Sequence, residues 1–158
     1  MSRLLGKPPI NPILFLTGKI AGYIAWIALV LQLSGTDFRQ FTLPAFFSWA
    51  GYFLLAAGLL LSIISLFHLG NSVSFGVPVE ATTLRVGGLY KYSRNPIYAG
   101  FFFLSAAAAL LTSNVYVLVL GVYSTAVYHL IILGEERFLK ERFGSAYEEY
   151  CKKVRRYF

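Results

Sequence analysis

The chain has 158 residues, of which 57% are hydrophobic, 17% aromatic and only 13% charged. Soluble domains average about 25% charged residues, so the composition excludes an ordinary soluble domain and indicates an integral membrane protein with one domain, residues 1–158. The formal net charge is +7, but the basic residues flank apolar segments, which points to membrane topology and not to nucleic acid binding.

Four apolar segments predict four transmembrane helices, at about residues 13–33, 44–69, 96–111 and 115–133. The first segment reaches roughly 30 Å at the helical rise per residue, which is enough to cross the hydrocarbon core of a bilayer. The third segment is shorter, and we expect it to form a tight antiparallel hairpin with the fourth through a turn at residues 112–114. The expected fold class is therefore an all-α, polytopic integral membrane protein with a C-terminal helical hairpin.

Two segments outside the apolar runs carry most of the polar residues. Residues 70–95 contain repeated glycines that break regular structure, and Asn95-Pro96 is typical of a helix N-cap followed by the first helical position. Residues 134–158 predict an amphipathic cytoplasmic tail helix that Gly144 interrupts. Its apolar stripe consists of Leu139, Phe143, Ala146, Tyr147, Tyr150 and Val154. We expect this helix to lie along the membrane surface or against residues 70–95.

The basic residues set the expected topology. They cluster near the N-terminus, within residues 70–95 and in the tail, whereas the opposite face carries Arg39 alone. The positive-inside rule then places both termini, the long loop and the tail in the cytoplasm.

Polar residues from distant parts of the chain are expected to meet on this cytoplasmic face. Glu135 and Glu136 follow the second helix of the hairpin, so they should return close to Arg94, which precedes its first helix. Tyr98 lies three residues after Asn95 and shares nearly the same helix face. Backbone amides at a helix start favour a carboxylate or phosphate, whereas a glutamate favours an amine or ribose hydroxyls. The cluster therefore suits a ligand that carries both positive and negative groups.

Three separated sequence blocks support a more specific interpretation. They are Gly88-Leu89-Tyr90 with Arg94-Asn95-Pro96-Ile97-Tyr98-Ala99-Gly100, then Glu135-Glu136, then Phe143-Gly144 with Tyr147, Tyr150 and Val154. In order and spacing, over roughly residues 69–157, they resemble the superfamily of isoprenylcysteine carboxyl methyltransferases and phospholipid methyltransferases. The resemblance implies a membrane enzyme that uses S-adenosyl-L-methionine, in a pocket built by the long loop, the hairpin ends and the tail.

The residues assigned to this site fall into two groups. For cofactor binding we assign Gly88, Leu89, Tyr90, Arg94, Asn95, Tyr98, Glu135 and Glu136. An arginine can orient a carboxylate by a bidentate contact, which makes Arg94 and Arg156 catalytic candidates. The resemblance implies Glu135 as the third catalytic candidate, and no metal site is assigned. The expected acceptor is a membrane lipid, or a small molecule that is lipidated or carries a thiol or carboxylate. Two residues depart from the family pattern: Asn95 stands where the prenylcysteine enzymes carry histidine, and Arg155 stands where proline is usual.

Two other functions remain compatible with the sequence. Some membrane sterol reductases have a similar C-terminal half and bind NADPH, although they are much longer. A non-catalytic membrane adaptor could also keep the same fold without the activity.

Individual residues also have plainer explanations. The two glutamates could be solvated charges at a helix start, and Arg94 could be a topology anchor. Tyr92 and Tyr150 are predicted to lie at the membrane interface. His129, inside the fourth apolar segment, is either a functional residue or a neutral histidine bonded to a neighbouring helix.

Overall fold

The computed structural model describes residues 8–69 and 83–158, and these residues form helices and connecting segments without a strand. The helices are α1 (Pro12–Leu33), α2 (Ala45–Leu69), α3 (Pro96–Thr112), α4 (Val115–Phe143) and α5 (Ser145–Lys153), with a short 3-10 helix, η2, at Gly88–Lys91. The N-terminal Arg3 and Lys7, and the part of the long loop from 70 to 82, lie outside the described residues.

Helices α1, α2 and α4 are long and apolar enough to cross a membrane, and α3 is a shorter apolar helix of 17 residues. The outer face of α2 exposes large apolar side chains, with Phe46, Trp49 and Phe53 each more than 70% exposed. Such a surface suits contact with lipid, because exposing a large apolar patch to water would be costly. The predicted all-α polytopic fold is confirmed.

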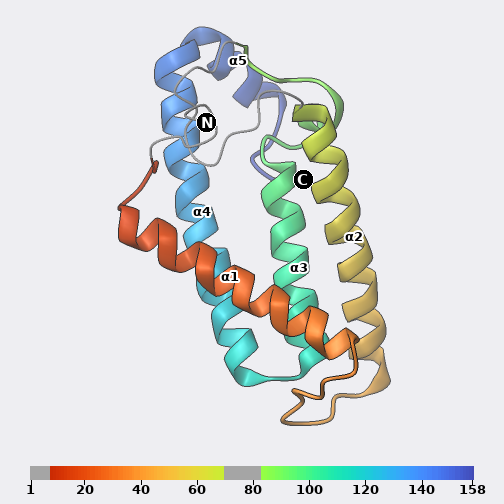
Figure 1. Cartoon of the computed structure of the whole chain (residues 1–158). Coiled ribbons are helices and arrows are strands. Elements are labelled where there is room, and N and C mark those ends of the chain that lie inside the picture. Colours follow the sequence, from red (N-terminus) through yellow and green to blue (C-terminus); the bar gives the residue numbers. More distant parts are fainter. Residues whose placement is uncertain (1–7, 70–82) are drawn as a thin grey trace.

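Helices α2, α3 and α4 run side by side, and α1 crosses α3 and α4 obliquely (Figure 1). Small residues allow the close approaches. A Cβ atom on Gly58 of α2 would lie 2.9 Å from the carbonyl oxygen of Gly100 in α3, and one on Gly22 of α1 would lie 2.5 Å from Ser124 Oγ in α4. The core of the bundle is built from Ala25, Leu29, Ala107, Ala108, Leu111 and Val117.

The hairpin of α3 and α4 has the tight turn that was expected. Ser113 adopts a left-handed conformation with φ 43°, and the Asn114 side chain caps α4 by accepting hydrogen bonds from the amides of Tyr116 and Val117. Because this turn is only two residues long, the start of α3 and the far end of α4 must lie at the same end of the bundle.

Helix α4 does not end where its apolar segment ends. It continues ten residues past Leu133 to Phe143 and stops at Gly144, whose φ of 52° favours glycine. Glu135 and Glu136 are therefore inside a continuous helix, which excludes their interpretation as charges at a helix start. Helix α5 then folds back at this end (Figure 1).

The tail packs against the polar loop, which is one of the two arrangements predicted for it. Tyr147, Tyr150 and Val154 form a buried cluster, with Leu84 from the loop packed against it. The predicted apolar stripe is confirmed apart from Ala146, which is exposed.

Candidate functional site

One carboxylate, that of Glu136 in α4, binds two arginines from other parts of the chain. Its Oε1 atom lies 3.0 Å from Arg94 Nε and 2.9 Å from Arg94 Nη2. Its Oε2 atom lies 2.9 Å from Arg156 Nε and 2.8 Å from Arg156 Nη2. Each arginine thus makes a hydrogen bond and an ion-pair contact to one oxygen. The hydrogen bond to Glu136 raises the pKa of Arg156. The side chains of Glu136 and Arg94 are each only 11% exposed, so the contact between them is shielded from water.

These contacts are part of a clamp between the C-terminal segment and the residues that precede α3. The Arg94 amide donates to the Arg155 carbonyl at 2.9 Å, and Arg94 Nη1 donates to the Val154 carbonyl at 2.7 Å. The buried Ser93 hydroxyl donates to the Arg156 carbonyl at 3.3 Å. Ser93 was missed by sequence reasoning, since a single serine in a loop carries no signal of its own.

Asn95 belongs to the same clamp. It occupies the N-cap position of α3, as predicted, but its side chain does not cap the helix. Instead, Asn95 Nδ2 donates to Glu136 Oε1 at 3.1 Å and to the Arg156 carbonyl at 3.3 Å. The capping role inferred from the Asn-Pro pair is therefore wrong for the side chain, because a buried carboxylate is available as a stronger acceptor.

The neighbouring glutamate has a different partner. Tyr98, one turn into α3, donates its hydroxyl to Glu135 Oε1 at 2.9 Å. The Tyr98 ring is fixed by Phe101 and Tyr128, with ring centroids 5.9 and 5.8 Å away. The predicted approach of Tyr98 and Asn95 to one site is realised as two adjacent pairs, Tyr98 with Glu135 and Asn95 with Glu136.

A second side chain interacts with Glu135, and sequence reasoning did not assign it to the site. Lys19 of α1 attracts the Glu135 carboxylate electrostatically. A lysine within an apolar span is the one signal that could have pointed to it.

The residues of η2 are held by elements on both sides. Gly88 has φ 60°, and the amide of Leu89 donates to His68 Nδ1 in α2 at 3.2 Å. Tyr90 is buried, and its carbonyl accepts a hydrogen bond of 2.6 Å from the Tyr150 hydroxyl. Tyr90 also interacts electrostatically with Glu135, whereas the contacts of Gly88 and Leu89 are with His68.

Tyr150 corrects a prediction. It was expected at the membrane interface, but it is only 9% exposed and belongs to the tail cluster, whereas Tyr92 is 70% exposed. Burial raises the pKa of Tyr150 to about 12, so its hydroxyl stays protonated and can donate to η2.

An apolar groove of about 600 Å³ lies between α3 and α4. Phe102, Ala106, Ala109, Leu118, Gly121 and Val122 are among its lining residues. Its polar lining residues are Ser105, Thr125, His129 and Tyr157. His129 Nδ1 lies 2.7 Å from the Tyr157 hydroxyl. Since Tyr157 directly follows Arg156, the groove runs up to the clamp.

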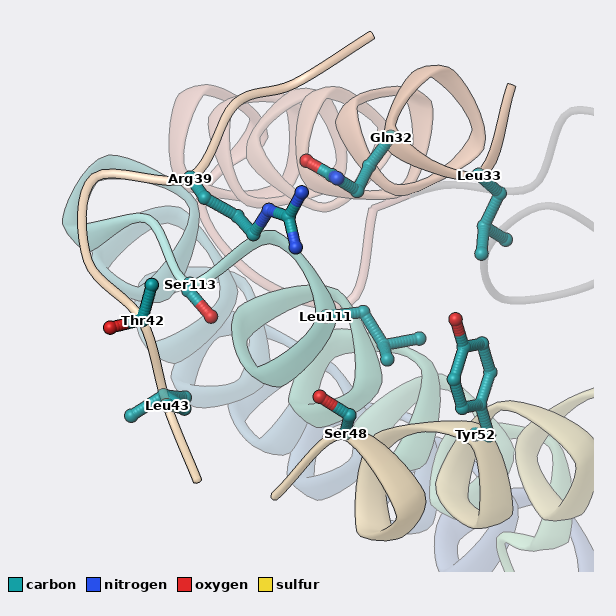
Figure 2. Close-up of a pocket in the computed structure, with 9 residues that line it drawn as sticks. All are labelled: Gln32, Leu33, Arg39, Thr42, Leu43, Ser48, Tyr52, Leu111 and Ser113. Atoms are coloured by element: carbon teal, nitrogen blue, oxygen red, sulfur yellow. The ribbon is translucent and has the colours of Figure 1, made fainter. Parts of the chain in front are cut away.

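A second pocket, of about 240 Å³, lies at the opposite end of the bundle (Figure 2). Gln32, Arg39, Ser48 and Tyr52 are among the residues that line it, and none of the predicted site residues does. Arg39 is already paired with Asp37 at 2.9 Å, and both side chains are more than half exposed. This pocket is therefore separate from the arginine and glutamate clusters.

Comparison with known proteins adds to this geometry. Residues 46–146, more than half of the chain, match the family model described as phospholipid methyltransferase. The chain belongs to this family. The match ends after α4 and contains Arg94, Tyr98 and both glutamates, but it leaves out α1 and the C-terminal arginines.

Two curated relatives are both called protein-S-isoprenylcysteine O-methyltransferase. The chain is 37% identical to that of Schizosaccharomyces pombe over 68 residues, 42% of this chain and 29% of the relative. It is 26% identical to that of Dictyostelium discoideum over 110 residues, 67% of this chain and 46% of the relative. The matched segments therefore span less than half the length of either relative. No solved structure matches the chain. The resemblance to this superfamily is confirmed, and the comparisons do not favour the reductase or adaptor alternatives.

Proposed function

We propose that this chain transfers the methyl group of S-adenosylmethionine to a lipid-bearing acceptor at the cytoplasmic surface of a membrane. The observation that carries the proposal is the pairing of Glu135 with Tyr98 beside the Arg94–Glu136–Arg156 clamp. This polar cluster lies where an apolar helical hairpin ends, in a chain of the phospholipid methyltransferase family.

The side chains present fit this cofactor by their chemistry. S-Adenosylmethionine carries an amine and ribose hydroxyls, for which a carboxylate such as Glu135 is a suitable acceptor, and a carboxylate, which an arginine binds well. Arg94 is 11% exposed and already donates to Glu136 and Val154, so we assign it to ordering the clamp. Arg156 is 37% exposed and is the better candidate for direct contact with a ligand.

When bound, the cofactor would supply an electrophilic methyl group on its sulfonium. The residues of this chain then have to position the acceptor and exclude water, and positioning alone contributes up to about 7–11 kcal/mol in well-aligned reactions. A carboxylate or thiolate acceptor needs no strong base at this step. This division of labour suits a site whose carboxylates are already bound to protein partners.

The groove between α3 and α4 supports a lipid-bearing acceptor. Its lining is almost entirely apolar, so it can hold a hydrocarbon chain, and the polar pair of His129 and Tyr157 lies beside Arg156. A chain held there would bring its head group toward the clamp. The basic residues of the loop and tail support a cytoplasmic orientation for this end of the bundle.

The first test is calorimetric titration of the purified protein in lipid nanodiscs with S-adenosylhomocysteine, alongside the Glu135→Ala variant. Glu149→Ala is the matched control, because Glu149 is an exposed glutamate of α5. We expect micromolar binding to the native protein and the control, and loss of binding in Glu135→Ala with unchanged helicity. Absence of binding in a well-folded native sample, together with binding of NADPH, would refute the proposal in favour of a reductase.

A further inference from the structure

Lys19 is a charged residue inside a helix that is apolar enough to cross a membrane. It lies in the second turn of α1, is half-buried, and its Nζ atom lies 4.2 Å from the centroid of the Phe15 ring. A charged side chain at such a depth is costly and in general marks a function. A snorkelling lysine, which extends to the bilayer surface, is the ordinary alternative.

The packing of α1 along α4 places the N-terminal end of α1 at the site. Gly18, next to Lys19, packs against Val127 of α4, and a Cβ atom on Gly134 would lie 2.5 Å from the carbonyl oxygen of Pro9. Gly134 directly precedes Glu135, so the residues before α1 lie next to that carboxylate, and α1 runs from there along α4 past Val127.

Phe15, which lies one turn before Lys19 on α1, also packs close to the site. Phe15 packs against the buried cluster of Val127, Tyr128 and Ile131, and Tyr98 packs against this cluster as well. The Tyr98 hydroxyl is bound to Glu135, and Lys19 attracts the same carboxylate. Lys19, through Phe15, and the Tyr98–Glu135 pair therefore border the same buried cluster, and the charges of Lys19 and Glu135 attract each other.

We propose that Lys19 is a positioning residue of the site, whose ammonium group attracts the Glu135 carboxylate and fixes it in place for cofactor binding. The inference rests on the proposed function of Glu135. It adds α1 to the site, although α1 lies outside the residues that match the family model. Tyr98 binds one oxygen of Glu135, and Lys19 supplies the opposite charge that a carboxylate away from water requires.

The test is a double-mutant cycle on Lys19→Met and Glu135→Gln, measured by S-adenosylhomocysteine affinity in nanodiscs. Coupled charged neighbours interact strongly, so we expect Lys19→Met to weaken binding by roughly 10–100-fold, the upper part of the range that such couplings span. The affinity of the double variant should be no lower than that of the single variant with the lower affinity. Lys19→Arg keeps the charge and should restore most of the affinity, and Lys153→Met, at an exposed lysine of α5, should bind like the native protein.

A snorkelling lysine gives a different pattern. Native affinity in Lys19→Met, or additive losses in the double variant, would overturn the inference while leaving the proposed function intact. The same cycle is measured by thermal unfolding of the ligand-free protein, which reports the Lys19–Glu135 coupling independently. If the native protein does not bind the ligand but the unfolding cycle shows coupling, the proposed function is refuted. The interaction between Lys19 and Glu135 is then still supported. If neither cycle shows coupling, Lys19 has no part in the site.

Discussion

The clamp at Glu136 allows a quantitative prediction for Glu136→Gln. The side chains of Arg94 and Glu136 are both 11% exposed, and removing one partner of such a buried pair costs about 3–5 kcal/mol. The glutamine oxygen can still accept from one guanidinium, which favours the lower end of this range. Arg156 is 37% exposed, and a pair with that much solvent contact adds at most about 1 kcal/mol. We therefore expect the clamp to weaken by about 3–4 kcal/mol, or roughly 10²–10³-fold in its opening equilibrium.

Hydrogen exchange measures this opening directly. The Arg94 amide donates to the Arg155 carbonyl, so it exchanges only when the C-terminal segment leaves the start of α3. In Glu136→Gln its exchange should accelerate by the factor above, while the amide of Ala108 in the bundle core keeps its protection. Glu149→Gln, at an exposed glutamate of α5, is the control. Unchanged exchange at Arg94, or an equal acceleration at Ala108, would refute the reasoning, because the loss would then be absent or global.

Three further substitutions test other parts of the structure. Gly88→Ala should destabilise the protein by about 1–3 kcal/mol and weaken S-adenosylhomocysteine binding, because Gly88 has φ 60° and its Cβ would meet the ring of His68. The control is Gly87→Ala, where a Cβ meets nothing within 4 Å, and it should change neither the thermal midpoint nor the calorimetric affinity. Ala106→Phe should fill part of the groove and raise the KM for a lipid acceptor several-fold in a methyl-transfer assay, and a parallel loss of S-adenosylhomocysteine affinity would contradict this. Tyr150→Phe removes a hydrogen bond of 2.6 Å and should lower the free energy of unfolding by about 1 kcal/mol, so an unchanged thermal midpoint would show that the bond contributes nothing.

Hydropathy predicted the apolar helices well, and it failed where a helix left the apolar region. Helix α1 begins one residue before its predicted segment, and α2 begins one residue after. Helix α4 extends ten residues beyond Leu133, because the glutamates, leucine, lysine and arginines that follow are good helix formers. A change in polarity marks the edge of a membrane, but a helix ends only where the backbone is broken, here at Gly144.

The meeting of Arg94 with the two glutamates follows from the hairpin, and the division of partners between them does not. An antiparallel pair of helices with a two-residue turn must bring the start of α3 to the far part of α4. Successive residues of a helix point about 100° apart, so the partners of Glu135 and Glu136 depend on the rotation of α4 and on the path of the tail. The same holds for Lys19, whose attraction to Glu135 depends on the crossing of α1 over α4.

The two adjacent glutamates show how a bundle of apolar helices can place a polar cluster at one end. Apolar spans offer few donors and acceptors, since their backbone groups are bonded within the helices. Glu136 binds Arg156 and so holds the C-terminal segment, with Arg155 and Arg156, against the start of α3. That segment supplies the polar groups that the apolar spans lack. Because the Glu136 carboxylate is occupied by its two arginines, we propose that Glu135, the preceding residue of the helix, binds the ligand. This division predicts opposite signatures for the two positions: Glu136→Gln should loosen the tail and thereby lower affinity, whereas Glu135→Gln should lower affinity with the tail still docked. If Arg94 amide exchange accelerated equally in both variants, the two carboxylates would share one structural role.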